Sequence, residues 1–321
     1  MIGLGSGIVR GFVSGGGSFL LDQFSGSGAA YSTRRIASST TVLMRVRRDT
    51  AGGTGDDDEA DVAFDSNGEL SLDSIISNAS NGVAATTLGQ FINVGTVGGT
   101  TYTNPDSLSG TAVCTVTSWY DQSPRGNNLE QASHSSQPII HDGTSNQDLE
   151  KENGKVCLEL GTTKKMSVAS VSWSDVTARG DAYSVLSFNA FPTGQYEGSV
   201  YNMDTNLVQN GLISTSYNGT SVLKALAGQV SHPNPIVSTG TNYLVYHRSG
   251  GSYTTGSSLL VAINGGALST QRSGTRNWSG MNLNADGKAD YRINELIVFN
   301  PPSDSNRTDI ETNINDYYSI Y

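Results

Sequence analysis

Apolar and polar residues alternate in short runs along much of the chain, and after Thr111 these runs follow one another closely. Alternation with a period of two predicts strands whose side chains point to opposite faces of a sheet. The predicted strands contain the sequences TAVCTVTSWYD, QPIIHD, KVCLEL, AYSVLSFNAF, SVLKAL, TNYLVYHR, SSLLVAING and YRINELIVFN. Many short strands with little helical periodicity predict an all-β protein, an antiparallel β-sandwich or jelly roll.

Asn-Gly pairs mark turns between the apolar runs. Asn67-Gly68 closes a short predicted strand, DVAFDSNGEL, and Asn153-Gly154 and Asn264-Gly265 lie beside other strand-like runs. Asn and Gly adopt positive φ angles at low cost, which two-residue hairpin loops require. We therefore expect hairpin-type turns at Asn153-Gly154 and Asn264-Gly265.

The region before Thr111 predicts a mixture of elements. Residues 29–49 pass from a short helical or turn pattern into an alternation of apolar and basic side chains, which predicts a strand around Val42–Arg47. Leu72, Ile75 and Ile76 follow helical spacing and predict one brief helix.

The last segment differs because its apolar residues follow a helical period. Pro301 and Pro302 should end the preceding strand, and Ser303 or Asp304 could cap a helix. The residues on one helical face are Ile310, Ile314 and Tyr317. We expect a short C-terminal helix that packs on the sandwich.

The first residues form a glycine-rich ribbon with isolated apolar side chains, which are Ile2, Leu4, Ile8, Val9 and Phe12. Such a segment cannot build its own core, and glycine loses much backbone entropy on ordering. We expect residues 1–28 to be an extended anchor that docks on another subunit, and residues 29–321 to be one sandwich domain. A flexible leader is the alternative.

Composition excludes several classes of function. Only 15% of the residues are charged and the formal net charge is -10, which disfavours a nucleic-acid groove. No apolar run is long enough for a membrane helix, and the first residues lack the pattern of a secretory signal. The short basic run Arg45–Arg48 is followed by the acidic run Asp56–Glu59, so we expect the two runs to pair.

The sequence contains no pattern for a metal or redox cofactor. Cys114 and Cys157 lie in strand-like runs without CxxC spacing, which favours two buried thiols. The four histidines are scattered and lack HxH or HExxH spacing, so zinc is not expected. Ser123 does not lie in a GxSxG nucleophile elbow, so we do not expect a catalytic triad. The acidic run Asp56–Glu59 could hold calcium, but solvated charge explains it without a metal.

One stretch resembles a known family. Ser118–Ser123 has the sequence SWYDQS, and PRGNNLEQ follows it. This stretch resembles the YDQSGNGNHLTQ segment of α-L-arabinofuranosidase B catalytic domains, and the upstream run AAYSTRRIASSTTVLMRVRRD is similar to their pattern, so the resemblance covers roughly residues 29–145. The closing strand and helix resemble those of concanavalin A-like and laminin G-like domains. The resemblance implies a concanavalin A-like sandwich, a fold that hosts many functions.

The SWYDQS stretch supplies a set of candidate ligand-binding residues, namely Trp119, Tyr120, Asp121, Gln122, Asn127 and Asn128. Short polar side chains at a strand end can bond sugar hydroxyls, but they also fix turns through their own backbone. The tryptophans at 119, 173 and 278 and the tyrosine at 196 could stack on sugar rings, or cover the core instead.

A glycosidase needs two carboxyl groups beside the scissile bond. The resemblance implies Asp204 in place of the family's nucleophilic glutamate and Asp286 in place of its acid/base, with Glu197 as a second candidate. Asp204 is one methylene shorter than glutamate, and the paired cysteines that precede the family's nucleophile are missing from the run EGSVYNMD. We therefore do not expect an active enzyme; if the chain is active, it should be an arabinofuranosidase-type glycoside hydrolase.

Three functional classes fit these observations. In the favoured one, the chain resembles bacteriophage structural proteins that join a short LGLG-type start to a domain with the WYDQS word. It would be a capsid decoration, head fibre or tail protein, present in several copies, bound to capsid or tail proteins and assembled in the host cytoplasm. Its sandwich would face host cell-surface polysaccharide. The alternatives are an arabinofuranosidase-like hydrolase and a free carbohydrate-binding module.

Overall fold

The computed structural model describes residues 19–50, 57–106, 108–168, 170–174, 179–192, 197–203, 210–217, 220–227, 230–250, 260–268 and 278–321. The residues expected to anchor the chain, Ile2, Leu4, Ile8, Val9 and Phe12, lie outside these ranges. Every pairing between named strands is antiparallel, which confirms the expected all-β sandwich with a short C-terminal helix.

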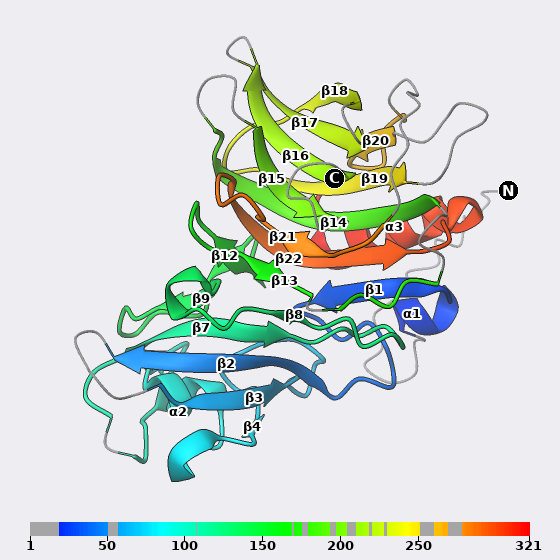
Figure 1. Ribbon diagram of the computed structural model, residues 1–321. Coiled ribbons are helices and arrows are strands. Elements are labelled where there is room, and N and C mark those ends of the chain that lie inside the picture. Colours follow the sequence, from blue (N-terminus) through cyan, green and yellow to red (C-terminus); the bar gives the residue numbers. More distant parts are fainter. Residues whose placement is uncertain are drawn as a thin grey trace, which may run out of the picture.

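One long, curled sheet runs through the molecule from bottom to top in Figure 1. Its strands, in hydrogen-bonded order, are β4 (Ile76–Ser77), β3 (Glu59–Ala63), β2 (Val42–Thr50), β7 (Ala112–Trp119), β9 (Ile139–Asp142), β12 (Leu158–Leu160), β22 (Asp290–Phe299), β14 (Arg179–Ala190), β19 (Asn242–Gly250) and β20 (Leu260–Ile263). β1 (Ser27–Ser32) pairs with the second half of β22, beyond β12.

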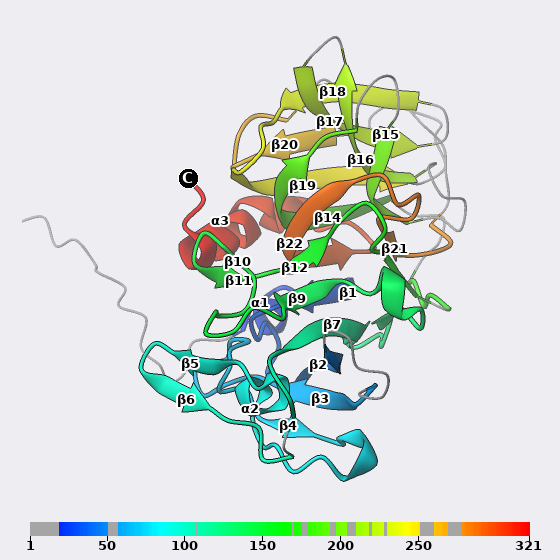
Figure 2. The same cartoon turned by 90° about the vertical axis from the view of Figure 1, so that its left-hand side faces the viewer.

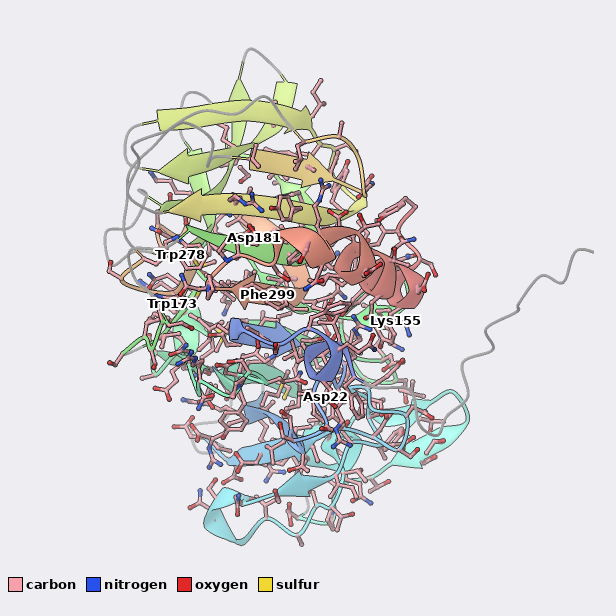
Figure 3. All side chains as sticks on the ribbon, turned by 90° about the vertical axis from the view of Figure 1, so that its right-hand side faces the viewer. Asp22, Lys155, Trp173, Asp181, Trp278 and Phe299 are labelled. Carbon is pink, nitrogen blue, oxygen red and sulfur yellow. The ribbon has the colours of Figure 1, made fainter. Side chains whose placement is uncertain are left out.

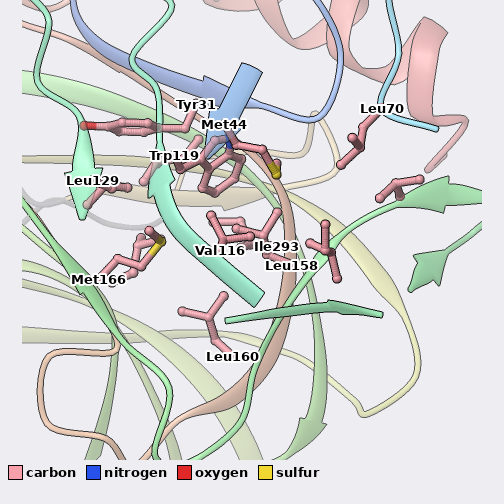
Figure 4. Close-up of a cluster of buried hydrophobic side chains, with 14 of the residues drawn as sticks. Tyr31, Met44, Leu70, Val116, Trp119, Leu129, Leu158, Leu160, Met166 and Ile293 are labelled. Atoms are coloured by element: carbon pink, nitrogen blue, oxygen red, sulfur yellow. The ribbon is translucent and has the colours of Figure 1, made fainter. Parts of the chain in front are cut away.

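A second row of strands faces the long sheet. It contains β8 (Leu129–Glu130), β13 (Met166–Ser167), β21 (Asn282–Leu283), β15 (Glu197–Asn202), β16 (Asn210–Tyr217), β17 (Thr220–Ala227) and β18 (Val230–Ile236). β8 also pairs with β7, so the two rows join at this edge. The main core lies between them, and Figure 4 shows the part around Trp119 and Ile293.

The strand β22 contributes to two cores because its side chains alternate. Ile293, Leu296 and Val298 point into the main core, whereas Ile297 and Phe299 point to the opposite face of the sheet. A register shift in the pairing with β14 lets the alternation change phase near the middle of the strand. The outer face would be exposed without a cover.

Two helices cover this outer face. α3 (Arg307–Tyr318) buries Ile310, Ile314 and Tyr318 against it, and α1 (Leu20–Gln23) adds Leu20. The expected C-terminal helix is therefore present, although its N-cap is Asn306, whose side chain makes no capping bond. The third described α-helix, α2 (Leu88–Ile92), contacts β7, and short 3-10 helices span Ser80–Gly82, His134–Ser136 and Asp304–Asn306. None of the described helices has the length and apolar character needed to cross a lipid bilayer.

Small hairpins complete the described fold. β5 (Gly95–Val97) pairs with β6 (Thr100–Tyr102), and β10 (Lys151–Glu152) pairs with β11 (Lys155–Val156). The turn between β10 and β11 is Asn153-Gly154, with positive φ at both residues, as the sequence predicts. Figure 2 shows this hairpin beside α3.

Paired charges hold β2 to β3 and to the chain before β3. Nε of Arg45 lies 2.7 Å from Oε2 of Glu59, and Nη2 of Arg48 lies 2.8 Å from Oδ2 of Asp58. The side chains of Arg47 and Asp57 also pair. The expected pairing of the basic and acidic runs is thus confirmed for the described residues.

Two local expectations are wrong. The helical spacing of Leu72, Ile75 and Ile76 does not make a helix, because Ile76 begins the edge strand β4, which pairs with β3. Ile76 is buried whereas its neighbour Ile75 is exposed, as strand alternation requires. The helical or turn pattern expected at the start of residues 29–49 is instead the strand β1, whose partner β22 is far away in the sequence.

Candidate functional site

Trp119 ends β7, and its indole is buried in the main core, where its ring centroid lies 5.7 Å from that of Tyr31. Trp173 and Trp278 are buried too, and their rings meet edge to face at 5.2 Å (Figure 3). The alternative in which these aromatic residues cover the core therefore describes all three tryptophans. Tyr196 lies outside the described residues.

The carboxylate of Asp121 accepts four hydrogen bonds inside the protein. Its Oδ1 accepts from the amides of Ala30 at 2.7 Å and Ser123 at 2.8 Å. Its Oδ2 accepts from the hydroxyl of Ser123 at 2.7 Å and the amide of Asn127 at 2.8 Å. Burial raises the pKa of Asp121. This carboxylate fixes the loop after β7 and binds the edge of β1.

The neighbouring amide side chains extend the same contact along β1. Nε2 of Gln122 donates to the carbonyls of Ser32 at 3.1 Å and Arg34 at 2.9 Å. Nδ2 of Asn127 donates to the carbonyl of Gly28 at 2.7 Å. These side chains and the loop they belong to therefore occupy the edge of β1 that β22 leaves free.

The remaining two predicted ligand-binding residues are also bonded within the fold. The hydroxyl of Tyr120 donates to Oδ1 of Asp61 at 2.8 Å, and Oδ1 of Asn128 accepts from the amide of Asp121 at 3.0 Å. The structure thus brings all six residues together, but as a brace between β7, β1 and β3. A sugar at this position would have to displace bonds that hold the fold together.

Asp286, the predicted acid/base residue, lies in the turn between β21 and β22. Asn284 and Gly287 both have positive φ, and the side chain of Asn284 is buried. Its Nδ2 donates to the carbonyls of Gly161 at 3.0 Å and Lys164 at 2.8 Å. This asparagine anchors the turn on a neighbouring loop and so fixes the place of Asp286.

The two carboxylate oxygens of Asp286 have different surroundings. Oδ1 accepts from the amides of Ser199 at 3.1 Å and Lys288 at 3.2 Å. Oδ2 is buried and has no hydrogen-bond partner among the described residues, and the same is true of Oγ of Ser199. Burial and the charge of Asp286 raise the pKa of Tyr291, whose ring lies between the layers. The turn therefore holds one carboxylate oxygen in place, whereas the other, which is buried, has no donor within the described ranges.

A second group of unpaired polar atoms lies deeper between the layers. The ring centroids of Tyr201 on β15 and His247 on β19 are 5.7 Å apart, and Ser184 on β14 is close to Tyr201. Among the described residues, both imidazole nitrogens have no hydrogen-bond partner, and the hydroxyls of Tyr201 and Ser184 lie near each other without a well-formed hydrogen bond. Burial lowers the pKa of His247 to about 3, so this histidine is uncharged at neutral pH.

The other predicted candidates give no metal or carboxylate cluster in the part of the chain that the structure describes. Asp204 lies outside the described residues, as does the side chain of Glu197. The described carboxylates of the acidic run are paired with arginines, and no group of three His, Cys, Asp or Glu in the described ranges could hold a metal ion. Cys114 and Cys157 are buried, as predicted, and burial raises the pKa of both thiols.

Sequence reasoning did not find Ser199, Tyr201 or His247. Ser199 and Tyr201 belong to EGSVYN, which has no strong strand alternation, and His247 belongs to a core strand. Their grouping depends on the pairing of β15 with β21 and of β19 with β14, which no local motif announces.

Comparison with known proteins supports the fold. No family model and no curated protein sequence matches this chain. A GH54 α-L-arabinofuranosidase soaked with a cyclic sulfate inhibitor superimposes with a TM-score of 0.55 and 15% identity, over 90% of this chain and 62% of that one. An arabinofuranosidase complexed with arabinofuranosyl-α-1,2-xylobiose gives a TM-score of 0.55 and 16% identity, over 92% of this chain and 64% of that one.

These similarities have a defined extent. Identity of 15% or 16% shows a shared β-sandwich fold, on which different activities can be built. The chain spans less than two thirds of the length of both arabinofuranosidases.

Proposed function

We propose that this chain is a carbohydrate-binding β-sandwich that holds its ligand without cleaving it. The observation that carries the proposal is Oδ2 of Asp286, a buried carboxylate oxygen without a donor, next to the unpaired hydroxyl of Ser199. An unpaired buried acceptor is costly, and a hydroxyl donor would offset that cost. A sugar ring carries neighbouring hydroxyl groups that can act as such donors.

Charge and fold support a neutral sugar. The formal net charge of -10 disfavours polyanionic ligands. One structure with a similar fold is an arabinofuranosidase in complex with arabinofuranosyl-α-1,2-xylobiose, which is a neutral pentose oligosaccharide. Neutral arabinose- or xylose-containing glycans are therefore the first ligands to test.

The runner-up is hydrolysis of an arabinofuranoside. Its general acid would have to give a proton to the glycosidic oxygen. Oδ1 of Asp286 is instead an acceptor from two backbone amides. Asp204 would have to act as the nucleophile, although its side chain is one methylene shorter than the glutamate that serves this role in the arabinofuranosidases. Binding without cleavage needs Asp286 only as a hydrogen-bond acceptor.

Calorimetry with neutral arabino- and xylo-oligosaccharides tests the binding site. Asp286→Asn should lower the affinity about 10- to 100-fold, because a charged acceptor is lost. Asp142→Asn is the matched control, since Oδ1 of Asp142 also accepts a backbone amide, that of Thr144, but on β9. Equal affinity in wild type and Asp286→Asn would refute the site. Turnover of an aryl arabinofuranoside that Asp286→Asn abolishes would favour the hydrolase.

We also propose that the sandwich is displayed in several copies on a bacteriophage virion, bound to capsid or tail proteins through the N-terminal segment. The support is the sequence of residues 1–28 and the resemblance to phage structural proteins. The last part of this segment also contacts the sandwich, because Leu20 is part of the outer core and β1 starts at Ser27.

The display proposal is tested by deleting residues 1–18, which leaves Leu20 in place. The shortened chain should keep the unfolding temperature of the full chain and its sugar binding, but should no longer be found in purified particles. Normal incorporation of the shortened chain would rule out the anchor.

A further inference from the structure

The hairpin β10–β11 places an asparagine against the end of the C-terminal helix. Asn153 and Gly154 form its two-residue turn, with φ of 49° and 75°, and both residues are exposed. Nδ2 of Asn153 donates to the carbonyls of Tyr318 at 2.8 Å and Ser319 at 3.3 Å. Figure 2 shows the hairpin next to α3.

This amide caps the C-terminal end of α3. The last carbonyls of a helix have no partner within the helix, and they carry the negative end of its dipole. Ser319 adopts a left-handed conformation with φ of 52°, and its amide donates to the carbonyl of Asn315, which closes the helix. The Nδ2 group of Asn153 adds a donor from outside the helix.

An asparagine followed by glycine is chemically labile. The backbone nitrogen of the glycine attacks Cγ of the asparagine, the C–N bond to the side-chain nitrogen breaks, and ammonia leaves as a succinimide forms. Water then opens the succinimide to aspartate or isoaspartate. Glycine has no side chain to hinder the attack, and the exposed turn is open to water.

We propose that Asn153 is a site of spontaneous deamidation, and that the reaction loosens α3 from the sandwich. The product replaces an N–H donor with a carboxylate that faces two carbonyl oxygens at the negative end of a helix. Both the lost hydrogen bonds and the like-signed charges disfavour the contact. α3 covers the outer core, which contains Phe299 and Tyr246, so this face would become accessible.

Three other Asn-Gly pairs, at Asn264, Asn81 and Asn67, differ in what they contact. Oδ1 of Asn264 accepts from the amide of Leu244 at 3.0 Å, a role that a carboxylate can keep. Nδ2 of Asn81 donates at 2.7 Å to Oδ1 of Asp58, the residue directly before β3. Asn67 is exposed in a turn after β3. Asn67 is therefore the matched control, because its deamidation adds the same charge without touching a helix end.

Two measurements on the full chain test the proposal. Peptide mapping by mass spectrometry after storage in mildly alkaline buffer should find aspartate and isoaspartate at Asn153. Hydrogen–deuterium exchange of residues 307–318 should then be faster in the stored protein, and also in fresh Asn153→Asp. The unfolding temperature of Asn153→Asp should fall by about 2 to 4 °C, whereas that of Asn67→Asp should not change.

Asn153→Gln keeps a side-chain amide but cyclises far more slowly, so α3 in this variant should keep its exchange rate during storage. The proposal is overturned if α3 exchanges equally slowly in Asn153→Asp and in wild type. It is also overturned if stored wild type gains aspartate at Asn67 but not at Asn153. If Asn153→Asp does not fold, the stored wild type gives the same comparison.

Discussion

Arg34 and Glu295 form a two-pronged ion pair under the C-terminal helix. Nε of Arg34 lies 2.9 Å from Oε2 of Glu295, and Nη2 lies 3.1 Å from Oε1. The glutamate side chain is fully buried and the arginine side chain is only 11% exposed. The pair joins the end of β1 to β22, two segments at opposite ends of the sequence.

Glu295→Ala should lower the free energy of unfolding by about 3 to 5 kcal/mol, because it leaves a buried guanidinium without its partner. The double change Arg34→Met with Glu295→Leu should cost much less, since neither charge remains. Urea denaturation of Arg34→Met, of Glu295→Leu and of the double variant gives the coupling energy. Additive effects would show that the pair does not act as a unit.

The brace around Asp121 makes a second prediction. Asp121→Ala removes an acceptor from four donors, among them the amide of Ala30, and should lower the free energy of unfolding by about 2 to 4 kcal/mol. Asn128→Ala, which removes one accepted bond in the same loop, should cost about 1 kcal/mol. Denaturation midpoints of the two variants check this order, and a loss in Asp121→Ala no larger than in Asn128→Ala would contradict it.

Two tyrosines between the layers should respond differently to loss of the hydroxyl. Tyr201→Phe removes a buried hydroxyl that makes no well-formed hydrogen bond within the described residues, so it should leave stability unchanged or raise it by up to about 1 kcal/mol. Tyr291→Phe removes a bond of 2.5 Å to the carbonyl of Val200 and should cost about 1 to 2 kcal/mol. Thermal and urea unfolding distinguish the two, and a clear loss in Tyr201→Phe would mean that its hydroxyl has a partner in solution.

The stability of the protein should decrease on mild acidification through His247. Its pKa is about 3 in the folded state, below that of an unfolded histidine, so the unfolded chain binds the proton first. This contribution is fully present above about pH 6.5 and falls by about 1.4 kcal/mol per pH unit as the pH drops toward the folded pKa.

The measurement is the free energy of unfolding between about pH 7 and about pH 5, where this histidine alone should account for roughly 2 kcal/mol. His247→Leu should reduce the slope over this range, whatever its own stability. His134→Gln is the control, because His134 is only partly buried and pairs with Asp49. An unchanged slope in His247→Leu would remove the buried histidine as the cause.

The sequence predicts strands well where apolar residues alternate, as in β7, β14, β19 and β22. It does not predict β15 and β16, because EGSVYN and NGLISTSY contain too many glycines, serines and asparagines to show a core-facing pattern. The spacing of Leu72, Ile75 and Ile76 fits a helix or an irregular strand, and only the pairing with β3 decides between them.

The candidate site shows the same limit. The sequence singles out Asp286, but the contrast between its two oxygens depends on the amide of Ser199, which a separate strand supplies. It also identifies Asp121, Gln122 and Asn127 as a group. It could not show that they face β1, because their partners lie about ninety residues earlier in the chain.

The loop after β7, which covers the free edge of β1, affects how the protein behaves at high local concentration. An open strand edge is a template on which a foreign chain can add itself, and repeated addition leads to fibres. At β1 the backbone groups that would accept such a strand are already bonded to carboxylate and amide side chains, which offer no continuing ladder. Neighbouring molecules can therefore come into contact at this edge without forming an intermolecular β-sheet.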